Sequence, residues 1–158
     1  MSRSGYNDDG DFDHWQLIRW RGAVNSAMNG KRGQAFLREL LDAIDSLSAP
    51  KLIAHDLVKY DGETDTNLAC AIGAVGLKRG LDMTRLDPED IESVAGQFGI
   101  ADAMAREIVY VNDEWELWGN ETPEKRFYRM RRWIVASIHG PVISEDESGR
   151  WVDDGGPA

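Results

Sequence analysis

Apolar residues recur at helical spacing through most of this 158-residue chain. The clearest stripe lies between positions 31 and 47 and comprises Phe36, Leu37, Leu40, Leu41, Ile44 and Leu47. Similar seams are predicted over 14–28, 87–99, 102–111 and 122–138. The connections between neighbouring seams are short, which favours antiparallel packing. The pattern predicts a mainly α fold, a compact bundle of about five to six helices with one optional short β-hairpin after residue 52.

Residues 68–78 are small and apolar and include two glycines, Gly73 and Gly76. Each glycine weakens an isolated helix by about 1 kcal/mol relative to alanine. An element packed closely on the small face offsets that cost, so we expect a short buried helix ending near Gly80. Arg21 and Arg131 lie close to the apolar seams of their helices, so each is expected to need a carboxylate partner.

The chain carries 28 Asp+Glu against 18 Lys+Arg, a net charge of −10. Much of this excess lies at the two ends, which are also rich in Gly and Ser. We therefore predict an acidic disordered N-terminal tail over 1–13, a single helical domain over 14–142 and an acidic flexible C-terminal tail over 143–158. The acidity argues against nucleic acid as a partner, because it repels phosphates. An acidic surface that imitates nucleic acid toward a basic protein is the alternative to a role in solubility alone.

The sequence contains no apolar run long enough to span a membrane, and residues 1–13 lack the apolar stretch of a secretion signal. The predicted location is therefore the cytoplasm, without membrane association. The oligomeric state is left open.

Cys70 is the single cysteine and is expected to begin the small apolar helix, where the helix dipole stabilises a thiolate. His55 and His139 are the candidate bases for a Cys–His pair. No protease or transferase signature surrounds the cysteine, and its flanking alanines suit a buried residue. We therefore assign no catalytic residue, and a Cys-dependent enzyme is kept as an alternative.

Residues 112–121 form a polar segment that contains two tryptophans, a residue type favoured at binding hot spots. We predict a partner-binding surface made of Asp113, Glu114, Trp115, Glu116 and Trp118. The alternative is that one or both tryptophans cover the core. The acidic spacing does not match an EF-hand, so no metal and no cofactor are predicted.

Two basic pairs lie at the ends of predicted helices: Lys31 with Arg32, and Lys78 with Arg79. If these four side chains converge, they form a site for a small anionic ligand or a nucleotide. The glycine-containing run 73–80 lacks the spacing of a phosphate-binding loop, so helix packing explains its glycines better.

Residues 91–108 have the packing skeleton of a helix-turn-helix unit. A DNA-reading helix needs side chains that meet phosphates and base edges. The second helix instead offers Asp102, Arg106, Glu107 and Asn112, so DNA binding is disfavoured.

The runs 21–27 and 30–41, 70–76 with 79–83, 98–100 and 112–114 resemble a group of small uncharacterised proteins encoded by phages and prophages, and the resemblance spans roughly residues 20–135. The resemblance implies a mobile-element origin and assigns no catalytic residue. Together with the acidic excess, it favours a non-enzymatic phage accessory protein that binds a host protein, such as a defence component in the manner of an anti-CRISPR inhibitor.

Overall fold

The computed structural model describes residues 3–4, 14–114, 120–140, 143–145 and 151–153. This part contains six helices: α1 (His14–Asn29), α2 (Lys31–Asp45), α3 (Ala71–Arg79), α4 (Ile91–Phe98), α5 (Asp102–Glu114) and α6 (Pro123–Ser137). It also contains two short antiparallel hairpins, β1 (Val58–Asp61) with β2 (Thr66–Ala69), and β3 (Ile143–Glu145) with β4 (Trp151–Asp153). The predicted mainly α fold with a short hairpin is confirmed.

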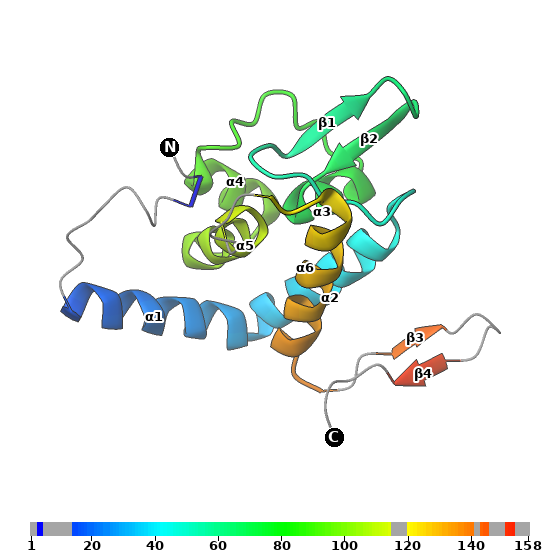
Figure 1. Cartoon of the computed structure of the whole chain (residues 1–158). Coiled ribbons are helices and arrows are strands. Elements are labelled where there is room, and N and C mark those ends of the chain that lie inside the picture. Colours follow the sequence, from blue (N-terminus) through cyan, green and yellow to red (C-terminus); the bar gives the residue numbers. More distant parts are fainter. Residues whose placement is uncertain (1–2, 5–13, 115–119, 141–142, 146–150, 154–158) are drawn as a thin grey trace.

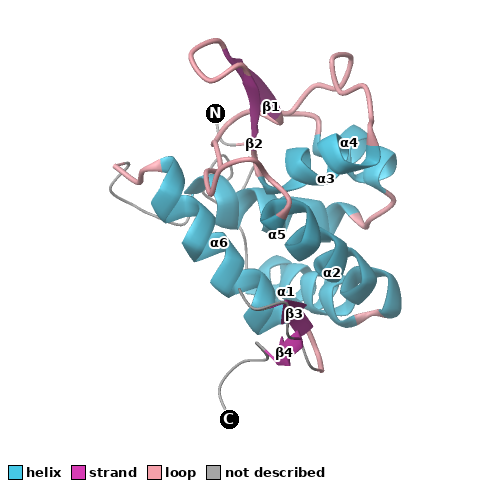
Figure 2. Cartoon of the chain, turned by 90° about the vertical axis from the view of Figure 1, so that its right-hand side faces the viewer, coloured by secondary structure: helices cyan, strands magenta, loops and turns pink. Residues whose placement is uncertain are grey.

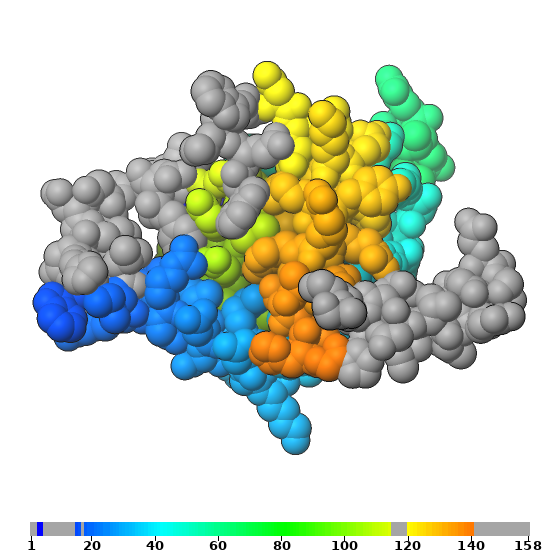
Figure 3. Space-filling view, turned by 60° about the horizontal axis from the view of Figure 1, so that its bottom comes forward, coloured from blue at the N-terminus to red at the C-terminus, as the bar shows by residue number. Residues whose placement is uncertain are grey.

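Helix α5 lies inside the bundle, in contact with α1, α3, α4 and α6 (Figure 1). Eight of its 13 residues are buried, among them Glu107 and Asn112. Helix α2 packs its predicted seam against α1, α3 and α6, with Leu37 and Leu40 fully enclosed. On the face shown in Figure 3, α1 (blue) and α6 (yellow to orange) are both at the surface.

The glycines of α3 allow the close packing that the sequence predicts. A Cβ atom at Gly73 would collide with the backbone carbonyl of Leu57, and one at Gly76 would collide with the side chain of Met83. Gly80 ends the helix in the left-handed conformation, with φ of 70°. The small residues of this run therefore place α3 directly against the segments before β1 and after α3.

The first hairpin lies later in the sequence than the predicted strand, which began at Leu52. Residues 52–57 are irregular because their backbone groups bond to other elements: the Leu52 N–H donates to Pro123 O at 3.1 Å, and Leu57 O accepts from the Cys70 N–H at 3.0 Å. The β3–β4 hairpin, within the predicted flexible tail, was not predicted. The two hairpins lie toward opposite ends of the molecule (Figure 2).

The start of α6 agrees with the sequence prediction, whereas the start of α4 does not. Thr122 caps α6 and Pro123 opens it, at the start of the predicted 122–138 seam. Helix α4 was expected to start at Asp87, but Asp90 is its cap, since Asp90 Oδ1 accepts from the Ser93 N–H at 3.2 Å. The Asp87 carboxylate caps a preceding turn by accepting from the Glu89 N–H at 2.9 Å.

The two arginines near the apolar seams both have carboxylate partners. Arg21 lies 3.4 Å from Glu107 of α5, and Arg131 lies 3.0 Å from Asp45 of α2. Arg21 itself is mostly exposed, so its burial is less than the seam position suggests. Within the described part of the chain, every helix is too short or too polar to cross a lipid bilayer.

Candidate functional site

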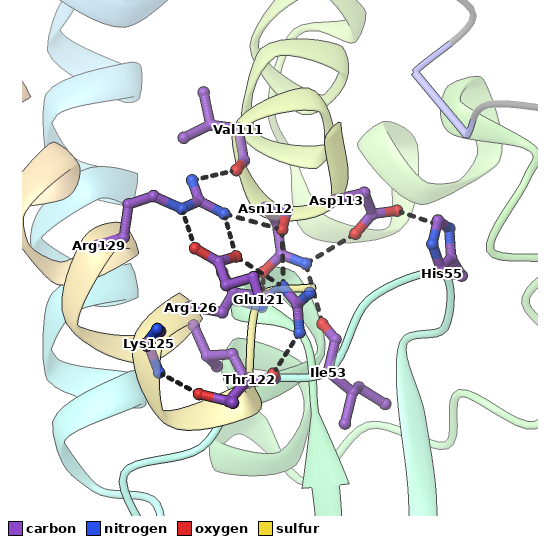
Figure 4. A network of polar contacts seen from close by, with 12 residues as sticks. Ile53, His55, Val111, Asn112, Asp113, Glu121, Thr122, Lys125, Arg126 and Arg129 are labelled. Carbon is purple, nitrogen blue, oxygen red and sulfur yellow. Dashed lines mark hydrogen bonds and ion pairs between the residues drawn. The ribbon is translucent and has the colours of Figure 1, made fainter. Parts of the chain in front are cut away.

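The C-terminal end of α5 is held by two arginines from α6 (Figure 4). The last carbonyls of a helix lack partners within it and carry a partial negative charge. Arg129 donates to the carbonyl of Val111, and Arg126 donates to the carbonyl of Asn112 at 3.0 Å. Both arginines also pair with Glu121, at 2.6 Å for Arg129 and 3.3 Å for Arg126. This network fixes the start of α6 against the end of α5.

The side chain of Asn112 joins three segments inside the fold. Its Oδ1 accepts from the Ala71 N–H at 3.2 Å, and its Nδ2 donates to Ile53 O at 2.9 Å and to Asp113 Oδ1 at 2.7 Å. The side chain is buried, so every bond replaces one that water would make. The sequence did not predict this role of Asn112, because its partners Ala71 and Ile53 lie 41 and 59 positions away.

Asp113 presents a buried carboxylate beside an exposed imidazole. Its side chain is 1% exposed, and its Oδ2 lies 2.8 Å from Arg3 Nε and 3.8 Å from His55 Nδ1. The His55 ring is 71% exposed and its backbone has φ of 70°, a conformation uncommon outside glycine. Figure 4 shows the Asp113 carboxylate directed toward His55.

Arg3 and Ser4 are buried, which differs from the disorder predicted for residues 1–13. Three residues of one α5 face bind them: Arg3 pairs with Asp113, Ser4 Oγ donates to Glu114, and Arg106 donates to Ser4 O at 2.9 Å. Burial opposes the charge of Arg3, yet Cys70 and Asp113 outweigh it and raise the pKa of the guanidinium above its ordinary value.

Cys70 is the N-cap of α3, so it lies at the start of this helix, where the sequence predicted it. The side chain is 1% exposed, and Sγ accepts from the Gly73 N–H at 3.3 Å. Among the described residues, no hydrogen bond joins the thiol to His55 or His139. His139 is instead bonded to Asn29 at 2.7 Å. In this conformation the sulfur is covered, and neither candidate base, His55 nor His139, both of which the structure describes, is hydrogen-bonded to it.

The predicted partner-binding surface divides into two groups. Asp113 is buried in its bonds to Arg3 and Asn112, and Glu114 accepts from Ser4. Trp115, Glu116 and Trp118 lie outside the described residues. The two members that the structure describes therefore make internal contacts.

The four predicted ligand-binding residues do not converge. Lys78 pairs with Asp42, and Arg79 binds Glu39 through two bonds of 2.6 and 2.8 Å. Lys31 and Arg32 instead line a separate pocket of about 210 Å³ between the start of α2 and the α4–α5 turn. The structure thus leaves two of the four cations at a cavity.

The α4–α5 pair has the expected turn, with Gly99 at φ of 72°. The second helix is enclosed by the bundle, and Arg106 and Glu107 are engaged with Ser4 and Arg21. Eight of the 13 residues of α5 are buried, whereas a DNA-reading helix presents a free face to the groove. Across the described ranges, no three His, Cys, Asp or Glu residues are arranged to hold a metal ion.

Sequence reasoning missed a groove of about 470 Å³ between the β1–β2 hairpin and the α3–α4 connection. Its apolar lining includes five partly exposed side chains: Val58, Leu77, Leu81, Met83 and Leu86. Asp56 and Asp82 stand among its polar lining residues. The available signal was three large apolar residues between positions 81 and 86, in a connection that otherwise reads as a polar loop.

Comparison of the chain with protein-family models, with curated proteins and with solved structures gives no match.

Proposed function

We propose that this protein is a non-enzymatic binding module whose groove receives a segment of a partner protein. The supporting observation is the groove itself, because large apolar side chains remain partly exposed along a concave surface. Exposed apolar surface that is concave and has a polar border is typical of recognition sites. The inferred ligand segment inserts one or more apolar side chains between the hairpin and the α3–α4 connection.

The charge of the groove favours a basic partner. Its eleven lining residues include Asp56 and Asp82 and no lysine or arginine. Asp56 is exposed at the border, and the whole chain carries a net charge of −10. Such a field attracts a segment with lysine or arginine beside its apolar residues and speeds the encounter at low salt.

The hairpin extends this surface outward. In the antiparallel register Tyr60 pairs with Asn67 and Val58 pairs with Ala69, so Tyr60 and Val58 project to the same side of the sheet. Val58 and Asn67 line the groove, and Tyr60 is 60% exposed beyond it. A tyrosine in this position offers a large contact at low conformational cost.

The resemblance to phage-encoded proteins supports an inference about what kind of protein the partner is. In this proposal the partner is a host protein with a basic surface, such as a nucleic-acid-binding component of a defence system, and the acidic groove occupies that surface. The proposal replaces the surface predicted at 113–118 with the groove, since Asp113 and Glu114 are engaged internally.

The experiment selects ligands from a displayed library of random short peptides on the immobilised protein. We expect enriched sequences to combine apolar residues with lysine or arginine, and their affinity to fall as salt rises. Leu86→Asp places a charge in the groove and should weaken binding at least about tenfold. The matched control, Tyr128→Asp, puts the same charge on an exposed side chain of α6 and should bind normally.

A second variant protects this test from a folding failure. Asp56→Lys changes an exposed border residue and should weaken the same peptides, whereas Glu89→Lys outside the groove should not. Neutral or acidic consensus sequences, or affinities unchanged by both groove variants, would refute the proposal. In host extract, the relevant partner is one retained by Tyr128→Asp and lost by Leu86→Asp.

A small anionic ligand at Lys31 and Arg32 is the second candidate, because both cations line the 210 Å³ pocket at the start of α2. A thermal-shift panel of nucleotides tests it. Stabilisation by a nucleotide that disappears in Arg32→Ala supports this candidate, and no shift across the panel excludes it.

A further inference from the structure

Arg3 and Ser4 occupy a receptor that α5 builds for them. Asp113 and Glu114 follow Arg106 by seven and eight positions, a spacing that places all three along one side of the helix. Asp113 binds the Arg3 guanidinium, Glu114 binds the Ser4 hydroxyl, and Arg106 donates to the Ser4 carbonyl. Side chain and backbone of the dipeptide are thus recognised together, as in a peptide-binding site.

The site does not pair all the hydrogen-bond donors of Arg3. Arg3 and Asp113 have side chains that are 2% and 1% exposed, so their pairing takes place away from water. Nη1 and Nη2 of Arg3 are nevertheless buried without a hydrogen-bond partner among the described residues. A guanidinium has five N–H donors, and leaving buried donors unpaired is unfavourable. The segment is therefore held less firmly than its burial suggests.

The Arg3–Ser4 segment is also distant in sequence from the first helix. Residues 5–13 lie between Ser4 and the start of α1, a connection of nine residues. Withdrawal of the segment would remove the guanidinium from Asp113 Oδ2 and the Ser4 hydroxyl from Glu114.

From these observations we propose that this face of α5 is a binding site for an arginine residue in an extended peptide, filled here by the chain's own Arg3–Ser4. An arginine segment from another polypeptide, whether a second copy of this chain or a different protein, competes for the same contacts. The site lies on α5 and is independent of the groove.

Cys70 provides the readout, because it is the single thiol of the chain and lies beside Arg3. In Arg3→Ala, labelling of Cys70 by a thiol reagent under native conditions should be at least about tenfold faster than in the wild type. Arg19→Ala removes an exposed arginine of α1 and should leave the rate unchanged. An unchanged rate in Arg3→Ala would overturn the proposal.

A peptide with the sequence of residues 1–6 then tests binding in trans. It should slow Cys70 labelling in Arg3→Ala in a saturable way, and the same peptide with citrulline in place of arginine should not. The wild type should bind the peptide at least about tenfold more weakly, because Arg3 competes. Failure of the arginine peptide to protect would show that the segment is a fixed part of the fold and would overturn the proposal.

Two further arms identify the source and guard against misfolding. If a second copy supplies the arginine, wild-type protein added to Arg3→Ala should protect Cys70 and sedimentation should detect a dimer; protection without self-association assigns the site to other proteins. Should Arg3→Ala unfold, the arginine peptide must restore its melting temperature and the citrulline peptide must not. Equal effects of the two peptides refute an arginine site.

Discussion

The side-chain oxygen of Asn112 accepts a hydrogen bond from the backbone N–H of Ala71, so a residue near the end of α5 caps the start of α3. Asn112→Leu keeps the volume and leaves the Ala71 N–H and the Ile53 carbonyl unpaired. We expect it to lower the free energy of unfolding by about 2–5 kcal/mol, measured by urea denaturation. Asn120→Ala, at an exposed position, should change stability little; equal effects would contradict the capping role.

The glycines of the helices should respond to alanine in a fixed order. Gly73→Ala pushes a methyl group into the Leu57 carbonyl and is expected to cost about 3 kcal/mol. Gly76→Ala meets the thioether of Met83, which can move, and should cost about 1 kcal/mol. Gly22→Ala in α1 meets nothing within 4 Å and should stabilise by about 0.5–1 kcal/mol. Thermal melts of the three variants check this order.

The Arg79–Glu39 pair should make stability depend on pH. The hydrogen bond from Arg79 lowers the pKa of Glu39 below its ordinary 4.5. A carboxylate with a lowered folded pKa stabilises the fold above its unfolded pKa, and this contribution disappears as pH falls through the folded pKa. The pair is partly exposed, so the contribution is at most about 1 kcal/mol. Denaturation in acid should show a shallower pH dependence for Glu39→Gln than for the wild type, and identical slopes would exclude the pair as a source.

Arg79 also lies over two aromatic rings, 5.9 Å from the Phe36 centroid and 5.7 Å from that of Phe98. Lysine cannot reproduce both this stacking and the two bonds to Glu39. We expect Arg79→Lys to lose about 1 kcal/mol at neutral pH in denaturant titration, whereas Arg85→Lys, at an exposed position, should be neutral.

Removal of Glu121 should destabilise the junction of α5 and α6. Its side chain is largely buried between Arg126 and Arg129, so Glu121→Ala leaves two arginines facing each other without their shared carboxylate. The expected loss is about 3 kcal/mol. Glu124→Ala removes a half-exposed partner of Lys51 and should cost no more than about 1 kcal/mol. Equal losses of stability in the two variants would show that the buried Glu121 network contributes no more than an exposed ion pair.

Periodicity was sufficient to predict the helices because their apolar faces are local patterns. Residues close together in the sequence determine three such features: the seam of α2, the start of α6 at Thr122–Pro123, and the end of α3 at Gly80. The carboxylate partners of Arg21 and Arg131 were also foreseeable in kind, since a charge near an apolar seam needs one. Their identities depend on which helices meet, and single-helix patterns do not specify that.

The candidate sites depend on contacts between distant segments, and there the sequence was a poorer guide. Asp113 was predicted as surface, but it is buried because Arg3, 110 positions earlier, covers it. Lys78 and Arg79 pair with Asp42 and Glu39 in the second half of α2. They therefore do not join Lys31 and Arg32 at the start of that helix. The groove arises where the hairpin and the α3–α4 connection meet, and no local pattern marks that meeting.

The long-range capping of α3 has a consequence for biosynthesis. The Ala71 N–H and the Leu52 carbonyl find their partners in Asn112 and Arg126, which leave the ribosome 41 and 74 positions later. A nascent chain lengthens at about 5–20 residues per second, so the stretch from 52 to 71 waits several seconds for the groups that order it. Ribosome-bound chains halted ahead of α6 are expected to be cut by protease in that stretch, whereas released chains resist.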